Sequence, residues 1–350
     1  MSYYGSQYGC NPKYISLYMV KAHPEWDVVW AFTNPEKYDI PGIRKVRYMS
    51  FRYFYELCTS RIILTNYRMT DLFRKRKGQV YVQTWHSSLR LKMIEGDALE
   101  TLPAHYVEMA KADSKQLDYL ISGCQYSTEI FNRCFWYDGK IISSGTPRND
   151  LMFVKDVMLR TRILRKIGLE EGSKVILYAP TFRKGDSLEY YNIDYARLVE
   201  TLEKARGGKW QILVRLHPHL RPYSKQLLGE EACVKDVTAY DDIQELLYAS
   251  DMIISDYSSL MFDFAMTLRP CMLYVPDLED YTQKDRKLYF NIKELPFPIC
   301  RDNDSLNNCI IYFKTEEYVE KVNQFLSTVG SFEKGNASET IMETVLNEIK

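Results

Sequence analysis

Two histidines of this 350-residue chain stand beside residues that could bind or transfer a phosphoryl group. His86 follows the apolar run 79–85 and precedes Ser87, Ser88 and Arg90. Histidine can act as a general base near neutral pH, and hydroxyls and cations bind phosphoryl oxygens. The alternative is a packed histidine held by backbone hydrogen bonds. The residues around this position favour neither interpretation over the other.

His217 ends a second apolar run, residues 210–216, and Arg215 precedes it by two positions. Side chains two apart on a strand point to the same side, so Arg215 and His217 together can bind a phosphate. His217 and His219 are also spaced like metal ligands. Because no cysteine or carboxylate accompanies them, we expect no metal there.

A serine pair, Ser258 and Ser259, follows another apolar run and begins a helix predicted over residues 258–266. The free N–H groups at the start of a helix favour an anion, and the two hydroxyls add donors. For a serine pair alone, a simple helix cap is the favoured alternative. Asp263 lies one turn further on, and it either reaches a ligand hydroxyl, such as that of a ribose, or is a solvated helix residue.

Two more polar clusters follow predicted strands. The loop 144–150 contains glycine and proline, which fix a tight turn, and Arg148 is expected to project from it. A salt bridge from Arg148 to Asp150 is the structural alternative. The second cluster, Ala-Pro-Thr-Phe-Arg, contains Pro180 and Thr181.

The elements that position these residues are predicted to alternate between strands and helices. In the C-terminal part, helices such as 194–205 separate strands predicted at residues 175–178, 210–216, 252–254 and 271–275. This alternation implies a doubly wound parallel sheet, which binds ligands at the carboxyl ends of its strands. The N-terminal part is less regular, with strands predicted at residues 27–32, 62–64, 79–85, 119–122 and 140–143.

Composition argues against several classes of protein. Lysine plus arginine and aspartate plus glutamate both number 46, so the formal net charge is zero and no nucleic-acid partner is expected. The eight cysteines form no C-x-x-C pair, so reduced thiols are expected. No secretory signal and no membrane-spanning run is expected. The basic run 74–77 is predicted to be a solvated loop or to contact anionic lipid head groups or a polyphosphate acceptor.

Five segments resemble, in order, the motifs of the CDP-glycerol glycerophosphotransferase family, the polymerases and primases of teichoic acids and capsules: QTWHSSLRLK, SGTPRND, LYAPTFR, VRLHP and DDIQELLYASDMIISDYSSLMFDFAM. The segments GSQYGCNPKYI and GSFEKGNASETI resemble the edges of that family. The resemblance implies an α/β, GT-B-like fold, in which two Rossmann-type domains have parallel sheets facing a central cleft. We expect an acceptor-side domain over residues 1–155, a CDP-polyol-binding domain over 156–335, and a helix over 336–350 that crosses back to the first domain.

The resemblance implies transfer of glycerol phosphate from CDP-glycerol to a hydroxyl of a lipid-linked saccharide or of a teichoic-acid or capsule polymer, with release of CMP. It assigns a catalytic role to His86 and His217. It assigns substrate binding to Ser87, Ser88, Leu89, Arg90, Arg148, Pro180, Thr181, Arg215, Leu216, Ser258, Ser259 and Asp263. No metal or cofactor is expected, since the arginines would take the place of magnesium.

The sequence departs from the family in the loop after His86, which reads Ser-Ser-Leu-Arg where the family has Gly-Thr-Pro-Leu. Glycine lets the backbone approach a phosphate closely, so this difference bears on the polyol and on the geometry of the loop. The alternatives are a ribitolphosphotransferase using CDP-ribitol, a GT-B nucleotide-sugar glycosyltransferase, and a non-catalytic module that binds anionic polymer. The expected location is cytoplasmic, peripheral on the inner face of the cell membrane.

Overall fold

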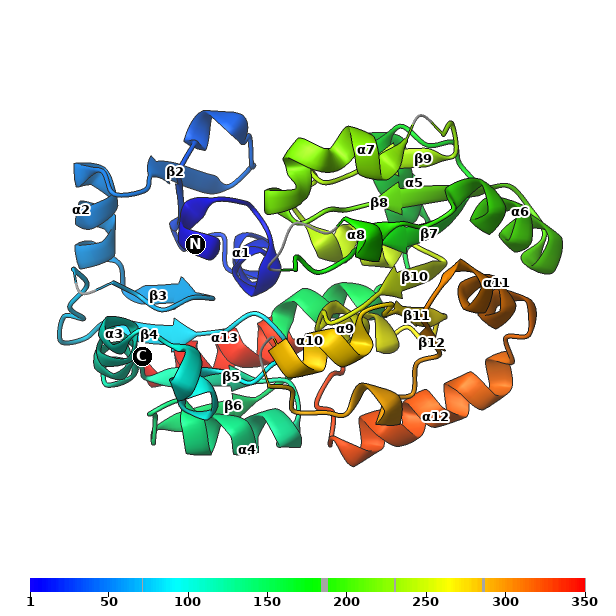
Figure 1. The fold of residues 1–350 in the computed structure, drawn as a ribbon. Coiled ribbons are helices and arrows are strands. Elements are labelled where there is room, and N and C mark those ends of the chain that lie inside the picture. The colour runs from blue at the N-terminus through cyan, green and yellow to red at the C-terminus, as the bar shows by residue number, and fades with distance from the viewer. Residues whose placement is uncertain (71, 184–187, 230, 285–286, 350) are drawn as a thin grey trace.

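The structure of the chain is a computed structural model that describes residues 1–70, 72–183, 188–229, 231–284 and 287–349. The described residues form an α/β fold with three parallel sheets (Figure 1). A two-stranded sheet pairs β1 (Val28–Phe32) with β2 (Ile43–Arg47). A four-stranded sheet has the order β3-β4-β5-β6, with strands at Ile62–Thr65, Val80–Gln83, Tyr119–Ser122 and Lys140–Ser143.

The third sheet belongs to the C-terminal half of the chain and has the order β12-β11-β10-β7-β8-β9. In chain order its strands are Lys174–Tyr178, Trp210–Val214, Val234–Asp236, Met252–Ser255, Cys271–Tyr274 and Ile299–Cys300. Successive residues of β7 belong to two different cores: Val175 and Leu177 pack on one face, and Ile176 and Tyr178 on the other. A strand buried on both faces needs a continuous apolar run, which is why these strands are visible in the sequence.

Helices cover both faces of the larger sheets (Figure 1). Those of the N-terminal half are α1 (Cys10–Ala22), α2 (Phe51–Thr59), α3 (Ala104–Ser114) and α4 (Gln125–Cys134). Those that follow are α5 to α13, at Val157–Ile167, Tyr195–Arg206, Ser224–Leu228, Ile243–Ala249, Leu260–Ala265, Leu278–Lys284, Asn303–Ile311, Thr315–Thr328 and Ala337–Glu348.

The last helix, α13, packs in the core of the N-terminal half. Ile341 and Val345 share a buried cluster with Ile15 of α1 and Val82 of β4. Asp150 caps the helix, since its carboxylate accepts hydrogen bonds from the Ala337 and Ser338 amides at 2.8 and 2.9 Å. The division into domains at residues 155 and 335 stays a prediction.

Contacts at two places help to join the halves of the chain. On one side, Lys13 of α1 forms ion pairs with Asp242 and Glu245, next to and within α8, at 2.6 and 2.5 Å. On the other, the stretch after the His86 loop runs antiparallel to residues 287–289, with the Met93 amide donating to the Lys287 carbonyl at 2.9 Å. The His86 loop therefore lies in a region that both halves help to fix.

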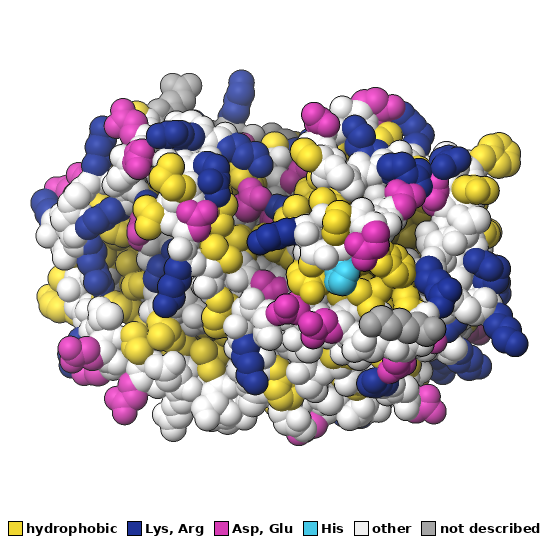
Figure 2. Space-filling model, turned by 180° about the vertical axis from the view of Figure 1, so that it is seen from behind, with side chains coloured by type: hydrophobic (Ala, Val, Ile, Leu, Met, Phe, Trp, Pro, Cys, Tyr) yellow, Lys and Arg dark blue, Asp and Glu magenta, His cyan; other side chains and the backbone are white. Residues whose placement is uncertain are grey.

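The face opposite to that of Figure 1 carries cationic and anionic side chains interspersed with apolar ones (Figure 2). This agrees with the zero net charge of the chain. Among the described residues, no helix has the length and apolar character needed to cross a membrane.

Candidate active site

A sharp turn after β4 carries His86. Trp85 has a φ of 48°, in the left-handed region that bulky residues rarely adopt, and its amide donates to the side chain of Gln83 at 3.0 Å. The buried side chain of Asn11 holds the same turn, because its amide group donates to the carbonyls of Thr84 and Trp85 at 3.0 and 3.1 Å. Strained backbone of this kind is concentrated at functional sites.

The protonation of the His86 ring follows from one contact. His86 is half-buried and stacks on the ring of Trp85 at 4.5 Å, and its Nδ1 lies 3.4 Å from the carbonyl oxygen of Asn66. A carbonyl oxygen only accepts hydrogen bonds, so Nδ1 carries the proton of the neutral ring. Nε2 therefore keeps a free lone pair, as a general base requires.

The surroundings of His86 keep the ring neutral. Burial lowers its pKa to about 3, and the positive charges of Arg148 and Arg90 add to this effect. A general base works best when its pKa lies near the working pH. An anionic phosphate beside the ring would favour the charged form and raise this pKa, so the substrate itself would bring His86 closer to its working range.

The loop after His86 is buried against the start of α4. Ser87, Ser88, Leu89 and Arg90 are each no more than 5% exposed. A Cβ atom added to Gly123 would lie 2.7 Å from the Cα of Ser88, so the loop needs glycine at that position.

Arg90 is a buried cation without an anionic partner among the residues that the structure describes. Its guanidinium lies 4.2 Å from the ring centre of Phe131, and its Nη2 donates to the Ser87 carbonyl at 3.2 Å. Its Nε and Nη1 have no hydrogen-bond partner, and within the described residues no carboxylate forms an ion pair with it. Burial lowers the pKa of Arg90 to about 10. An unpaired buried charge is costly, so this position favours an anion.

Arg148 and Asp263 form a buried ion pair. Asp263 also accepts hydrogen bonds from the side-chain amides of Asn149 and Gln244, both at 3.2 Å. The solvated alternative for Asp263 is wrong, because it is 1% exposed. A salt bridge from Arg148 to Asp150 is also wrong, because Arg148 pairs with Asp263 and Asp150 caps α13.

Glu333 fixes the loop that carries Arg148. Its carboxylate accepts hydrogen bonds from the amide of Thr146 and the side chain of Asn149, both at 3.0 Å. Burial raises the pKa of Glu333 to about 7. The loop 144–150 is therefore held from two sides, by Asp263 and by Glu333.

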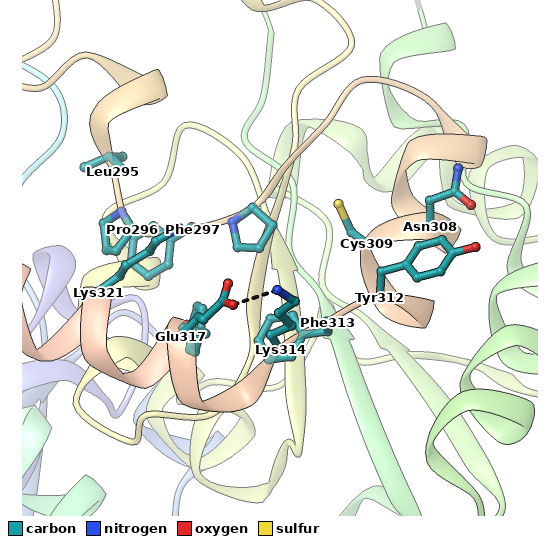
Figure 3. Close-up of a pocket in the computed structure, with 12 residues that line it drawn as sticks. Leu295, Pro296, Phe297, Asn308, Cys309, Tyr312, Phe313, Lys314, Glu317 and Lys321 are labelled. Atoms are coloured by element: carbon teal, nitrogen blue, oxygen red, sulfur yellow. Dashed lines mark hydrogen bonds and ion pairs between the residues drawn. The ribbon is translucent and has the colours of Figure 1, made fainter.

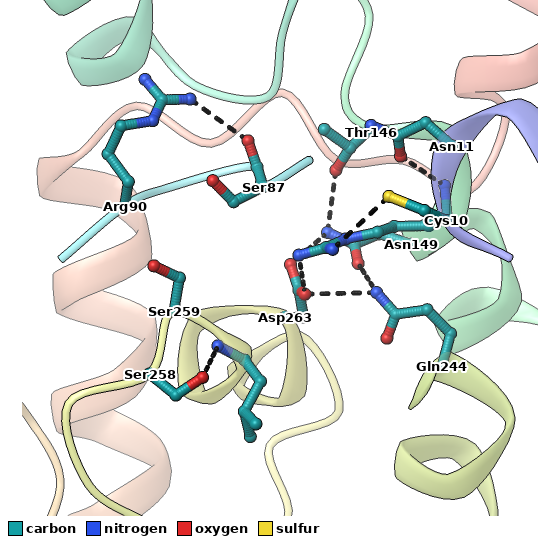
Figure 4. A network of polar contacts seen from close by, with 12 residues as sticks. Cys10, Asn11, Ser87, Arg90, Thr146, Asn149, Gln244, Ser258, Ser259 and Asp263 are labelled. Carbon is teal, nitrogen blue, oxygen red and sulfur yellow. Dashed lines mark hydrogen bonds and ion pairs between the residues drawn. The ribbon is translucent and has the colours of Figure 1, made fainter. Parts of the chain in front are cut away.

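The serine pair contacts the His86 loop. Ser259 Oγ accepts from the Leu91 amide at 3.2 Å, whereas Ser258 Oγ accepts from the amide of Leu260, at the start of α9, at 3.4 Å. The helix predicted over 258–266 is shorter, Leu260–Ala265, so its dipole adds little. The structure thus brings the His86 loop and the serine pair together (Figure 4).

Pro180 and Thr181 end β7 beside a second buried ionic cluster. The amide and hydroxyl of Thr181 donate to the carboxylate of Asp256 at 2.8 and 2.6 Å, and Pro180 is buried. Arg183 pairs with Asp256 and, at 3.0 Å, with Asp277. The Thr181 hydroxyl would have to leave Asp256 before it could donate a hydrogen bond to a substrate.

His217 is exposed, unlike His86. Its Nδ1 accepts a hydrogen bond from the His219 amide at 3.3 Å, so Nε2 carries the proton of the neutral ring. Burial, His219 and Lys92 lower its pKa. Arg215 donates to the Tyr240 carbonyl at 3.2 Å, and Leu216 is buried.

A separate pocket of about 550 Å³ lies between α11, α12 and the chain before β12 (Figure 3). Its lining includes Phe297, Tyr312 and Phe313, with Lys314 and Lys321 among the charged residues. None of the predicted site residues lines this pocket. It is therefore not the site indicated by the histidines.

Several residues that hold the site were missed by sequence reasoning: Asn11, Asn66, Gln244 and Glu333. Two of them, Asn11 and Glu333, lie in the two edge segments that resemble the family, and this was the available signal. Asn66 acts through its backbone carbonyl, which no sequence pattern reveals.

Comparison with known sequences identifies the family. The sequence model described as CDP-Glycerol:Poly(glycerophosphate) glycerophosphotransferase matches residues 1–347. A teichoic acid poly(glycerol phosphate) polymerase of Staphylococcus epidermidis is 32% identical over 100% of this chain and 50% of its own length. The chain thus spans about half the length of that relative. A polymerase of the same name from Bacillus spizizenii is 31% identical over 99% of this chain and 90% of its own length.

Comparison with solved structures confirms the predicted α/β, GT-B-like fold. The wall teichoic acid polymerase TagF matches with a TM-score of 0.88 at 32% identity, over 100% of this chain and 88% of that one. A putative UDP-N-acetylglucosamine 2-epimerase from Listeria monocytogenes, at 13% identity and a TM-score of 0.59, shares the fold alone. The chain therefore belongs to the CDP-glycerol:poly(glycerophosphate) glycerophosphotransferase family.

Proposed function

We propose that the chain transfers glycerol phosphate from CDP-glycerol to a hydroxyl of a lipid-linked saccharide or teichoic-acid polymer and releases CMP. Family membership and the names of the relatives support this activity. The observation that carries it is the contact of His86 Nδ1 with the Asn66 carbonyl, which leaves the Nε2 lone pair free, in a loop whose buried Arg90 has no ion pair among the described residues.

In the proposed reaction, Nε2 of His86 takes the proton of an acceptor hydroxyl while its oxygen attacks the phosphorus that bears the glycerol. The bond between that phosphorus and the CMP oxygen breaks, and CMP leaves. His217 is suited to the opposite task, because its Nε2–H can donate to a diphosphate oxygen. Arg215 and Arg90 would stabilise charge on the diphosphate, as preorganised donors do in phosphoryl transfer.

Arg148 and Asp263 take an indirect part in this proposal. Their mutual ion pair positions the loop 144–150, and Arg148 acts on His86 through its charge. Ser258 and Ser259 likewise hold backbone amides, and Ser259 fixes the end of the His86 loop.

The test is release of CMP. The protein is incubated with CDP-glycerol, CDP-ribitol and a panel of sugar nucleotides, together with an acceptor, and the released nucleotide is measured by chromatography. CMP from CDP-glycerol alone supports the proposal, and CMP from CDP-ribitol would assign the ribitol alternative. Release of nucleotide from a sugar nucleotide alone would assign the glycosyltransferase. Binding of anionic polymer with no nucleotide released from any donor would contradict transfer and favour the non-catalytic module.

We also propose that the α2 end of the N-terminal half contacts the inner face of the membrane, which makes the protein peripheral. Phe51 and Tyr55 on α2 are 97% and 58% exposed, and Leu72 is 65% exposed. The basic run 74–77 adjoins them, since Arg76 donates to the carbonyl of Cys58 on α2 at 2.9 Å. Apolar side chains next to cations match the surface of an anionic bilayer, where each cation contributes about 1 kcal/mol.

This surface is tested by sedimentation with vesicles of phosphatidylglycerol and phosphatidylcholine. Phe51→Ser should weaken binding to the anionic vesicles. The matched control is Tyr312→Ser, which removes an aromatic ring that is 76% exposed in the C-terminal half. Equal losses in the two variants, or equal binding to neutral vesicles, would contradict the assignment.

A further inference from the structure

We propose that Tyr3 is a further substrate-binding residue, whose hydroxyl donates a hydrogen bond to a phosphoryl oxygen held beside His86. The inference rests on the proposed function and names a contact that completes it. The phosphoryl oxygen belongs either to the diphosphate of the donor or to a phosphate of the acceptor, and the experiment below separates the two.

Tyr3 lies near His86 and is held by the same residue, Asn66. Tyr3 is half-buried, and its ring centre lies 6.1 Å from that of His86. Its backbone amide donates to the side chain of Asn66 at 2.9 Å, and the carbonyl of the same Asn66 faces His86 Nδ1. The tyrosine is therefore anchored to the residue that orients the proposed base.

The hydroxyl of Tyr3 donates its hydrogen bond to a weak acceptor. The Tyr3 hydroxyl donates to Cys10 Sγ at 3.5 Å, and Arg148 Nη1 donates to the same sulfur at 3.7 Å. A thiol sulfur is a weak acceptor. Two strong donors thus share one weak partner, and an anionic oxygen would be a better partner for the Tyr3 hydroxyl.

Tyr3 also lies near positive charges. The hydroxyl lies close enough to Arg148 and Arg215 for their positive charges to lower the pKa of Tyr3, although burial raises it overall. The phenol therefore stays protonated at every pH of interest and can only strengthen binding of an anion. A phosphate here would be contacted by a neutral donor, in the field of two cations and near the ring of His86.

The backbone around Tyr3 is strained. Tyr3 and Tyr4 have φ values of 43° and 55°, and Cys10 has a φ of 59°. Non-glycine residues adopt this region at an energetic cost, and they persist where the surrounding structure imposes them, often at functional sites. The segment is held by the Thr33 amide, which donates to the Gly5 carbonyl at 2.8 Å. The chain therefore keeps Tyr3 in place by a strained but well-anchored turn.

Tyr3→Phe tests the inference, because it removes the hydroxyl and keeps the ring against His86. CMP release is measured while CDP-glycerol and the acceptor are varied in turn, with sn-glycerol 3-phosphate and glycerol as two acceptors that differ by one phosphate. A lost hydrogen bond to a charged group corresponds to about tenfold or more in KM. A rise in the KM of CDP-glycerol with both acceptors assigns the donor phosphate. A rise only in the KM of sn-glycerol 3-phosphate assigns the acceptor phosphate.

The matched control is Tyr4→Phe, the same chemical change in the adjacent strained residue. Tyr4 is 43% exposed and packs on Tyr67 with ring centres 4.0 Å apart, so its loss should leave both KM values unchanged. A second variant, Cys10→Ser, replaces the weak acceptor with a hydroxyl. The Tyr3 hydroxyl should then bond more strongly to residue 10 and less readily to the phosphate, which raises the KM that rises in Tyr3→Phe.

The outcomes separate this inference from the proposed function. Turnover by the unaltered protein, with Tyr3→Phe within twofold in both KM values and in the affinity for CDP-glycerol measured by calorimetry, would overturn only the role of Tyr3. An unaltered protein that neither releases CMP nor binds CDP-glycerol would overturn the proposed function and the Tyr3 contact with it. A change in kcat and melting temperature with unchanged KM would make Tyr3 a structural residue and would also contradict the inference.

Discussion

The turns that carry the two histidines are built in opposite ways. The turn in the N-terminal half encloses His86 and ties its Nδ1 to a carbonyl, which leaves an acceptor at Nε2. The turn in the C-terminal half exposes His217 and gives its Nδ1 an amide donor, which leaves a donor at Nε2. One backbone contact therefore decides whether a histidine can remove a proton or stabilise a negative charge. The identity of the residue alone does not decide this.

We expect the largest effect on CMP release when each of the two histidines is replaced by alanine, and the two variants should differ. His86→Ala should lower kcat by about 10²–10⁴-fold, the usual contribution of a general base, while CDP-glycerol still binds. His217→Ala removes a hydrogen bond to a charged oxygen and should cost about tenfold to a hundredfold, seen mainly in KM. Steady-state CMP release measures both variants, with His105→Ala on the exposed face of α3 as the control. Equal losses in kcat in the two variants would contradict the different roles proposed for His86 and His217.

The next effect concerns the buried ion pair that joins the loop 144–150 to α9. Asp263→Ala leaves Arg148 buried without its partner, so the free energy of unfolding should fall by about 3–5 kcal/mol. Urea denaturation measures this change. The control is Asp304→Ala, whose ion pair with Arg197 at 2.5 Å is exposed and should contribute about 1 kcal/mol or less. A loss at Asp263 no larger than that at Asp304 would contradict the role of the buried pair.

Acid should also distinguish the two histidines. The pKa of His86 is about 3 in the folded protein and near 6.5 when unfolded, so only the unfolded chain binds the proton between these values. The contribution of His86 to stability is therefore complete above pH 6.5 and falls as the pH drops toward 3, by at most about 1.4 kcal/mol per pH unit. His86→Gln should remove this part of the pH dependence in denaturation curves at pH 7 and pH 5.

Glu333 opposes this trend, because its raised pKa, about 7, makes the folded protein bind more protons below pH 7. The difference between the unaltered protein and His86→Gln cancels that contribution. His217→Gln should change the slope less, because His217 is exposed. If the difference in stability between the unaltered protein and His86→Gln did not change with pH, the assignment of His86 to a buried environment would be contradicted.

The smallest effects come from the serine pair. Ser258→Ala removes the hydrogen bond to the Leu260 amide at the start of α9 and should lower stability by about 0.5–1 kcal/mol without changing KM. Ser259→Ala releases the Leu91 amide at the end of the His86 loop and should lower kcat/KM severalfold. Thermal melts and CMP release measure the two. The reverse pattern would show that Ser258 holds the substrate.

The sequence predicts a strand most clearly where a short run of consecutive residues is buried. Strands such as β7 and β10 are visible because both faces are buried, whereas β2 was missed because only Ile43 and Val46 of its five residues are buried. The motifs drew attention to His86, His217 and the serine pair, whose roles stay predictions, but the alternative that paired Arg148 with Asp150 was wrong. The partner of Arg148, Asp263, lies 115 residues away and is set by the packing of the two halves. The tautomers depend on the Asn66 carbonyl and the His219 amide, which have no signature in residue type.

The return of α13 to the N-terminal half has a consequence for biosynthesis. Ile341 and Val345 belong to the same core as Ile15 and Val82, so this core stays unfinished until the ribosome has translated almost the entire segment that intervenes. Contacts between positions so far apart in the chain slow folding. The four-stranded sheet of the N-terminal half should therefore stay partly exposed after its synthesis and depend on chaperones. It should complete its folding together with the six-stranded sheet of the C-terminal half.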